Sequence, residues 1–560
     1  MPETKSRFLI PVVGAAVVVV GSVAAFMYLR GPGGDSTGAL SSAKLVPSSA
    51  LMATYITTDP QAWAKLQQFG TPEAQKLVTK GLEDFNKDVL SDNSISYEKD
   101  IQPWVGGLMV AVLPPNAPKS NQSNQPPATQ LRQEPQMLMV VGIKDKLGAL
   151  NFANKLKGQK GVKSTESDYK GEKITQTTSE GNSNATYSAV LNNSYLVFSP
   201  EKPVVEKAID TFKGQPSFAT KDGASAVLAK GVDVKNSLAQ IYIPDYAGMI
   251  QQIVAANPQT TTLTPQTLKQ LQQVKSMVAA VGVDDAGVRL KAIANLDPQL
   301  NKFQYQNSPA KIVGQFPSDT FALVSGQGIS QSWKTIVEQS NEYPEFKQAL
   351  EQARSQLKTA NFDLDKDIFG WMDGEFAFGT IPSNQGILAR VGFGGAMVFN
   401  TSDRQTAQAT LTKLDNLAKT QTINVATRNV GGKDITEWQV PQQGALFAHG
   451  WLDQNTVFLA VGGPVAEALT NNKNQTLDNS ESFKAITSSL QKPNGGYFYL
   501  DMDKTMTIVN RFAAQSQQPI PPEANAILSS IRGLGVTATS PDKSTSQVEM
   551  LLALKPSTAK

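Results

Sequence analysis

The chain has 560 residues, which is too long for one hydrophobic core and predicts more than one domain. Lysine and arginine (51) nearly balance aspartate and glutamate (48), so the net charge of +3 argues against a nucleic-acid partner. The sequence contains no cysteine, which excludes disulfides, thiolate nucleophiles, cysteine-bound metals and a lipid-modified cysteine anchor.

The N-terminal region contains an apolar run long enough to cross a membrane. Phe8–Leu29 carries no charge over 22 residues, and as a helix it would span a hydrocarbon core of about 30 Å. A cleavable signal peptide with its site at Ser22–Ala24 is the alternative, but the apolar residues continue beyond that site. We therefore expect residues 1–30 to form a cytoplasmic tip and an uncleaved transmembrane signal anchor.

Basic residues before the apolar run predict its orientation. Lys5 and Arg7 favour a cytoplasmic N-terminus, which would place everything after residue 30 on the other side of the membrane. No later segment approaches 18 consecutive apolar residues, so we expect a single-pass protein held in the lipid bilayer by residues 8–29. Residues 31–44 are rich in glycine and serine, which is typical of a flexible tether.

One stretch of sequence occurs twice in the chain. Tyr97–Leu113 (YEKDIQPWVGGLMVAVL) and Leu364–Thr380 (LDKDIFGWMDGEFAFGT) each indicate a helix end, a tryptophan, a glycine turn and an apolar strand. The residues shared at identical spacing are Asp100, Ile101, Trp104 and Gly107 in the first stretch, and Asp367, Ile368, Trp371 and Gly374 in the second. We interpret the chain as two copies of one module, each with a buried tryptophan.

The segments around the repeated stretch recur in the same order and predict the fold class. The two strands that close each copy are expected at Met277–Val283 and Val288–Leu296, and at Gly533–Thr539 and Gln547–Leu554. Helices interspersed with adjacent alternating strands favour an α+β fold with mostly antiparallel sheets. We expect two tandem α+β modules, at residues 45–300 and 301–560, with a disordered polar insert at residues 114–135.

Two motifs connect the chain to a known family. YEKDIQPWVGG at Tyr97–Gly107 and LVPSSALMATYITTDPQAW at Leu45–Trp63, together with the apolar run before them, resemble the proteins grouped as domain of unknown function 3352. That family consists of membrane-anchored proteins found mainly in cyanobacteria, and the resemblance covers nearly the whole chain. It implies a photosynthetic bacterial host and a bulk located in the periplasm or the thylakoid lumen. It implies no activity, cofactor or catalytic residue.

The sequence offers few residues for catalysis. Its single histidine, His449, lies beside Trp451, and only carboxylates could join it in a metal or catalytic site. We interpret it as a structural residue in a strand or turn. The sequence has no Walker A motif and no GxSxG motif, and its Asp and Glu residues are too scattered to indicate a paired-carboxylate site. It therefore predicts no catalytic, cofactor-binding or metal-binding residue, and a protein that is not an enzyme.

Two local patterns approach known binding motifs without matching them. Asp363, Asp365 and Asp367 resemble the start of a calcium loop, but glycine and glutamate are missing from the positions that require them. We expect a solvated turn with a local cap, and an adventitious calcium contact is the alternative. The glycines at 326–328 and 392–395 lack the third glycine of a dinucleotide loop and are not expected between a strand and a helix.

Aromatic residues recur at matching positions in the two copies. Trp104 and Trp371 form one pair, and Tyr242 lies on a strand that matches Tyr497–Tyr499. A ligand groove lined by these rings is one interpretation. We favour core packing, because apolar residues at alternating positions bury one face of a sheet.

These observations favour a non-enzymatic, membrane-tethered, extracytoplasmic protein that binds another protein or organises a membrane complex. The main alternative is a carrier or chaperone for an apolar ligand, such as a lipid or a pigment, held between the two modules. A hydrolase is a third hypothesis. The sequence leaves open the identity of the partner, the oligomeric state, and the choice between plasma and thylakoid membranes.

Overall fold

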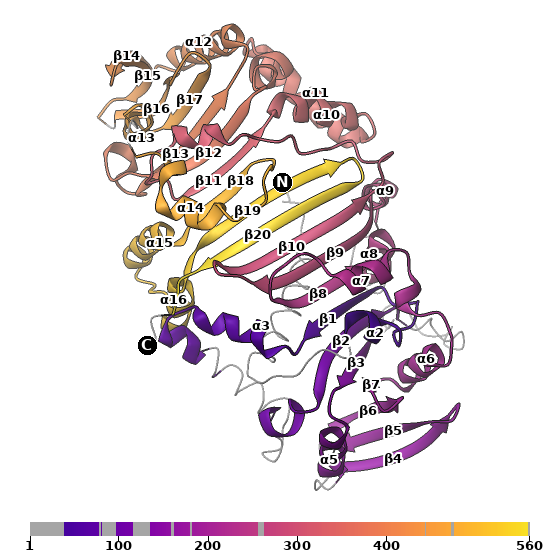
Figure 1. Ribbon diagram of the computed structural model, residues 1–560. Coiled ribbons are helices and arrows are strands. Elements are labelled where there is room, and N and C mark those ends of the chain that lie inside the picture. Colours follow the sequence, from indigo (N-terminus) through magenta and orange to yellow (C-terminus); the bar gives the residue numbers. More distant parts are fainter. Residues whose placement is uncertain are drawn as a thin grey trace. The chain divides into compact units, whose positions relative to one another are not determined.

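A computed structural model describes residues 38–77, 80, 97–115, 135–157, 162–179, 182–255, 263–442, 444–471 and 475–557. The chain divides into two compact units, Met1–Leu300 with Pro556–Lys560 (unit 1) and Asn301–Lys555 (unit 2). Both mix helices with antiparallel strands, as the α+β prediction requires (Figure 1). The expected membrane span at 8–29 and most of the insert at 114–135 lie outside the described residues. Within the described ranges, no helix is long and apolar enough to cross a membrane.

Unit 1 contains an antiparallel sheet whose described strands hydrogen-bond in the order β4–β5–β6–β7–β3–β2–β1–β8–β9–β10. Its strands are β1 (Met52–Thr57), β2 (Val105–Leu113), β3 (Gln136–Ile143), β4 (Val162–Tyr169), β5 (Glu172–Ser179), β6 (Asn182–Leu191), β7 (Tyr195–Ser199), β8 (Ser237–Ile243), β9 (Val274–Val283) and β10 (Gly287–Leu296). The closing strands β9 and β10 confirm the prediction from the sequence. Their ends differ from it by a few residues.

Helices cover both faces of the unit 1 sheet. They are α2 (Ala39–Ala43), α3 (Pro60–Ala64), α5 (Lys146–Lys157), α6 (Lys202–Phe212), α7 (Ala224–Lys230), α8 (Tyr246–Ala255) and α9 (Pro265–Leu271), with the short turns η1 (Lys65–Gln68), η2 (Tyr97–Ile101) and η4 (Phe218–Thr220). Helices α2, α6 and α7 bury apolar side chains with Tyr55 and Met109 on one face. Helices α8 and α9 pack against Ile241 and Ile243 on the other.

Unit 2 contains a second antiparallel sheet, whose described strands pair in the order β14–β15–β16–β17–β13–β12–β11–β18–β19–β20. Its strands are β11 (Ala322–Gln327), β12 (Glu375–Pro382), β13 (Phe393–Asn400), β14 (Asn424–Val430), β15 (Lys433–Val440), β16 (Gly444–Trp451), β17 (Thr456–Val461), β18 (Tyr497–Asp501), β19 (Ile531–Asp542) and β20 (Thr545–Leu554). Counted along the chain within each unit, the two sheets have the same order of pairing.

The helices of unit 2 follow its strands in a similar sequence. They are α10 (Ile329–Ser340), α11 (Pro344–Thr359), α12 (Arg404–Thr420), α13 (Gly463–Thr470), α14 (Glu481–Thr487), α15 (Met502–Ser516) and α16 (Pro522–Ser529), with the turns η5 (Lys311–Gln315), η6 (Leu364–Gly370), η7 (Gly386–Leu388) and η8 (Leu477–Asn479). Asp403 and Asp501 begin α12 and α15 as N-caps, each accepting a main-chain N–H three residues later.

The repeated stretch forms the same junction in both units. The indole N–H of Trp104 donates to the main-chain oxygen of Asp100 at 2.8 Å, and Trp371 donates to that of Asp367 at 2.8 Å. The two indoles are only 4% and 3% exposed, which confirms the predicted burial. The Asp100 carboxylate also binds Lys155 of α5, and the Asp367 carboxylate binds Lys413 of α12, at 2.7 and 2.6 Å. Each junction therefore joins a π-turn to the helix that follows the next two strands.

The glycine of each junction has a different purpose from the one expected. Neither Gly107 nor Gly374 has a positive φ, so neither supplies the tight turn that the sequence suggested. A Cβ at Gly107 would lie 2.2 Å from the Tyr55 hydroxyl, and a Cβ at Gly374 would lie 2.4 Å from the Asn400 carbonyl oxygen. These glycines are needed because a neighbouring strand or side chain approaches closely.

Truncating either tryptophan should destabilise mainly the unit that contains it. We expect Trp104→Ala and Trp371→Ala each to lower the free energy of unfolding by about 3–5 kcal/mol, as large aromatic deletions in cores do. The Phe variants keep most of the ring but lose the N–H donor, so they should cost less, about 1–3 kcal/mol. Denaturant unfolding followed by hydrogen-exchange mass spectrometry would assign each loss to a unit. Alanine variants that unfold like the parent would contradict this role.

Candidate functional site

The single histidine lies in a buried polar cluster of unit 2. His449 is on β16, one of the two settings predicted (a strand or a turn), and its Nε2 lies 2.8 Å from Oδ1 of Asp415 on α12. The indole N–H of Trp438 on β15 donates to the same oxygen at 2.7 Å. The carboxylate thus binds two sheet residues from a helix. His449 is buried, so this pair is placed to fasten α12 to the sheet rather than to meet a substrate.

Hydrogen bonds control the ionisation of Asp415. Burial by itself raises the pKa of this carboxyl, but the bonds from His449 and Trp438 outweigh it and hold the pKa below its ordinary value. The folded state therefore favours the carboxylate form. Sequence inspection missed Asp415, because nothing in the helical pattern of α12 distinguishes it from a solvent-exposed acid.

The three acids at the start of η6 point to different partners. Asp363 caps the turn by accepting the N–H groups of Asp365 and Lys366, which confirms the predicted local cap. The Asp365 carboxylate binds Arg354 at 2.9 Å and the indole N–H of Trp333 at 2.8 Å. Because these side chains do not converge, they form no calcium loop.

Asp367 corrects the expectation of a solvated turn. Its side chain is buried and accepts the N–H of Asp363 and the ammonium of Lys413. Burial alone raises the pKa of Asp367, but these two bonds lower it below its usual range. Across the residues that the structure describes, no group of three His, Cys, Asp or Glu side chains could hold a metal ion.

The structure also corrects the placement of one glycine pair. Gly326 lies on β11 and Gly328 is the N-cap of α10, so this segment does join a strand to a helix. The N-terminus of α10 is already engaged, because the N–H of Ser330 donates to the carbonyl of Met372 at 2.9 Å. Gly326 lies beneath the ring of Phe376. The segment therefore packs against the strands and offers no free cradle for a phosphate.

The strand aromatics divide between the core and the surface. Tyr242, Tyr497 and Tyr499 are buried, which confirms core packing for these three, and burial raises the pKa of the Tyr499 phenol well above its ordinary value. Phe498 contradicts the prediction, since 37% of it is exposed. It points to the opposite face from its two tyrosine neighbours, as alternation along a strand requires.

Phe498 belongs to an apolar row that crosses the unit 2 sheet. In the strand register, Val324 lies directly opposite both Phe378 and Phe498, and Phe498 continues to Val536 and Met550. Val324 is 43% exposed and Phe378 is 36% exposed. We call these five residues the unit 2 row. Three exposed apolar side chains therefore lie next to one another on this face of the sheet.

The same positions in unit 1 form a row of which three residues are buried and two, Ala279 and Ala292, are half-buried. By strand order and register they are Val110, Thr54, Ile241, Ala279 and Ala292. Val110, Thr54 and Ile241 are only 6%, 2% and 7% exposed. The sheets therefore agree in topology but differ in what this face presents. Sequence alternation does not reveal the difference, because it shows that residues share a face and not whether that face is covered.

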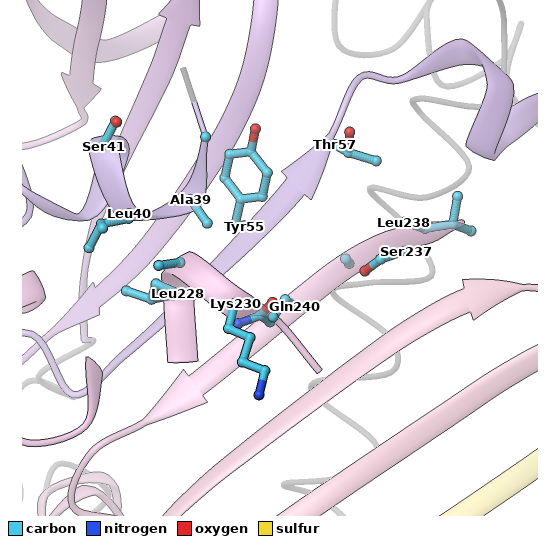
Figure 2. A pocket seen from close by; sticks show the side chains of 14 residues that line it. Ala39, Leu40, Ser41, Tyr55, Thr57, Leu228, Lys230, Ser237, Leu238 and Gln240 are labelled. Atoms are coloured by element: carbon cyan, nitrogen blue, oxygen red, sulfur yellow. The ribbon is translucent and has the colours of Figure 1, made fainter. Parts of the chain in front are cut away.

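A cavity of about 330 Å³ lies in unit 1, between the N-terminal ends of α2 and β8. Figure 2 shows its lining side chains, which come from α2, β1, α7 and β8. Lys230 is the only charged residue among them, and the amide of Gln240 donates to the Val227 carbonyl at 2.9 Å. A second cavity of about 390 Å³ lies between α15 and α16, lined by residues that include Asn510, Gln517 and Ile520.

Comparison with known proteins identifies the family of the chain. Residues 12–554 match the family described as "Protein of unknown function (DUF3352)", which is nearly the whole chain. The chain belongs to this family. The match confirms the resemblance drawn from Leu45–Trp63 and Tyr97–Gly107. No curated protein matches the sequence.

Solved structures give a weaker result than the family match. Crystal form IV of TP0453 is similar at 11% identity and a TM-score of 0.24, covering 45% of this chain and 79% of that one. Crystal form I of the same protein is similar at 9% identity and a TM-score of 0.25, covering 45% and 78%. A likeness of this size supports no inference about the DUF3352 chain.

Replacing Asp415 should reduce stability in a pH-dependent way. Because the pKa of Asp415 is lowered on folding, its stabilisation is present above the ordinary aspartate value of about 4 and is lost as the pH falls below it. We expect Asp415→Asn to lower the free energy of unfolding by about 1–3 kcal/mol at neutral pH. The difference from the parent should shrink below about pH 4 in urea titrations. Asp319→Asn, in an exposed turn, is the control, and an unchanging difference would contradict the assignment.

Proposed function

We propose that this DUF3352 chain is a membrane-tethered protein that binds another protein through the unit 2 row and has no catalytic activity of its own. Residues 8–29 would anchor it in the bilayer of a cyanobacterial plasma or thylakoid membrane, with both units outside the cytoplasm. The observation that carries the proposal is the exposure of Phe378, Val324 and Phe498 on adjacent strands.

The chemistry of the unit 2 row supports a protein partner. Two phenylalanines flank a valine in direct register, with Val536 and Met550 continuing the row across β19 and β20. Aromatic side chains and methionine are enriched in protein interfaces, and a few clustered anchors carry most of the binding energy. A row along the open face of a sheet suits a broad partner, whereas small ligands favour concave sites that enclose most of their surface.

We further propose that the two units are tandem copies of one module. Their identical order of strand pairing supports this, as do the equivalent hydrogen bonds of Trp104 and Trp371 and the equivalent ion pairs of Asp100 and Asp367. In a duplicated protein one copy is free to diverge. Unit 1 keeps the row under cover, with Thr54 and Ile241 buried. Unit 2 replaces these two residues with the exposed Val324 and Phe498, which is the change that a binding face needs.

A photo-crosslinking residue placed at Phe498 should test the partner in intact membranes. We expect benzoylphenylalanine at position 498 to give one discrete adduct with a different protein, and the same residue at Phe346 to give none. Phe346 is the matched control, because it is an exposed phenylalanine on α11 of the same unit. The captured protein, once purified, should bind the parent chain and lose at least about tenfold affinity for Val324→Asp, as loss of a central anchor predicts.

Three results would contradict this binding proposal. An adduct with a second copy of the chain would make the row a self-association surface, and an adduct with lipid or pigment would favour a carrier. Equal adducts from positions 498 and 346 would show that the row has no special role. Val324→Asp should keep a single cooperative unfolding transition in urea, so that its loss of binding is not loss of fold.

Protease accessibility should test the membrane orientation. We expect protease added on the non-cytoplasmic side of sealed vesicles to digest the chain beyond Arg30, because the uncharged span and the basic residues before it favour a cytoplasmic N-terminus. Immunoblotting with tags at each end would report the cleavage. Full protection of the C-terminal tag, with digestion of the N-terminal one, would overturn the orientation.

A further inference from the structure

The cavity of unit 1 has a counterpart in unit 2 that is already filled. Residues of β1 and β8 line the cavity, among them Thr57, Ser237 and Leu238. The register assigns their counterparts, since Ala53 pairs with Tyr242 in unit 1 and Leu323 pairs with Tyr499 in unit 2. Counting along these strands from the paired residues, the counterparts are Gln327, Asn494 and Gly495.

An extended segment of the chain, residues 303–308, occupies that place in unit 2. The N–H of Ser308 donates to the main-chain oxygen of Asn494 at 2.8 Å. The side chain of Tyr305 lies against Gly495, where an added Cβ would be 2.9 Å from the Tyr305 Cβ. Gln306 lies against Gly328 in the same manner. The segment therefore binds the ends of β11 and β18 through main-chain and side-chain contacts.

A carboxylate fixes this segment in unit 2 and is missing from unit 1. Glu375 accepts the hydroxyl of Ser308 at 2.6 Å and the N–H of Ile312 at 3.2 Å. Glu375 pairs with Gln327, and the residue at this register position in unit 1 is Gly107, which pairs with Thr57. This register differs by one residue from the spacing counted from the tryptophans, which matches Gly107 to Gly374. The side chain of Tyr55 lies over Gly107 instead. Unit 1 thus has the equivalent ends of β1 and β8, but it has no carboxylate at the position of Glu375.

The sequence before the cavity also differs in chemistry from the segment in unit 2. Residues 303–308 are Phe-Gln-Tyr-Gln-Asn-Ser, which supply two rings and several amides. Counted with the same offset as β1 and β11, the counterparts of residues 303–308 are residues 33–38, Gly-Gly-Asp-Ser-Thr-Gly, which have no aromatic or amide side chain. Gly38, the counterpart of Ser308, lines the cavity of about 330 Å³.

We infer that the unit 1 cavity binds an extended, uncharged segment of a partner protein, with amide and aromatic side chains like those of residues 303–308. The lining fits this chemistry, because it combines apolar residues such as Leu228 with hydroxyl and amide groups, and Lys230 is its only charge (Figure 2). The inference rests on the proposed function in assuming a protein partner. It concerns a different surface from the unit 2 row.

A peptide taken from the chain itself provides the probe. The capped, fluorophore-labelled hexapeptide Phe-Gln-Tyr-Gln-Asn-Ser should bind the full-length protein saturably in fluorescence anisotropy. Ala229→Arg introduces a large side chain at the exposed rim of the cavity and should weaken binding at least about tenfold, since a filled groove excludes the peptide. Ser237→Tyr is a second blocking variant, placed on β8. Ala226→Arg is the control, because Ala226 is exposed on α7 outside the lining.

The outcomes separate this inference from the proposed function. The inference is supported if Val324→Asp leaves peptide binding unchanged. It also requires that Ala229→Arg or Ser237→Tyr abolishes binding at the unit 1 cavity in a protein that unfolds like the parent. Absence of saturable binding overturns the inference. Binding that both blocking variants retain also overturns it, because the peptide would then bind elsewhere, for example at the place of residues 303–308 in unit 2. Equal or tighter binding of a peptide with the sequence of residues 33–38 also overturns it, because the chain's own segment would then be the occupant. Failure of the unit 2 row in crosslinking alters none of these results.

Discussion

Each unit depends on one hydrogen bond, from a buried indole N–H to a main-chain carbonyl one turn earlier. In unit 2, Trp371 makes this bond to Asp367, whose carboxylate is held by Lys413 of α12. Since a buried carbonyl or indole N–H without a partner is costly, the bond leaves the π-turn little freedom. The position of the π-turn then sets where β12 begins and where α12 lies on the sheet. Unit 1 repeats the arrangement with Trp104, so each unit contains an equivalent junction.

Much of this architecture could be predicted from the sequence, and the failures share a physical cause. The closing strands and the buried tryptophans follow from alternation and from residue spacing, which are local. Phe498, Asp367 and Asp415 were misjudged or missed, because their environments depend on residues far along the chain. Lys413 lies 46 residues from Asp367, and His449 lies 34 residues from Asp415. Alternation shows that Phe498 faces away from Tyr499 but does not show how far that face is covered.

The two units illustrate how one topology supports different surfaces. Strand register is set by the pattern of apolar residues and by turn geometry, so it survives changes of side chain that keep this pattern. Thr54 and Ile241 are buried at positions where Val324 and Phe498 are exposed. The cost of exposing apolar groups to water is about 25 cal/mol per Å². A sheet that keeps such a row exposed therefore gains from whatever covers it, and that gain is the driving force for the association we propose.

Binding of a segment at the strand ends costs less entropy in unit 2, where the segment belongs to the same chain, than it would in unit 1, where we propose that it comes from another molecule. In unit 2, residues 303–308 are joined to β11 by a short linker, so they occupy their site at a high effective concentration, and Glu375 fixes them further. A segment from another molecule must also lose translational and rotational freedom when it binds the same kind of groove. The unit 1 groove offers fewer fixed polar anchors, because Gly107 stands where unit 2 has Glu375. Such a groove suits a reversible contact, and a second contact at the unit 2 row would raise the combined affinity if one partner reached both.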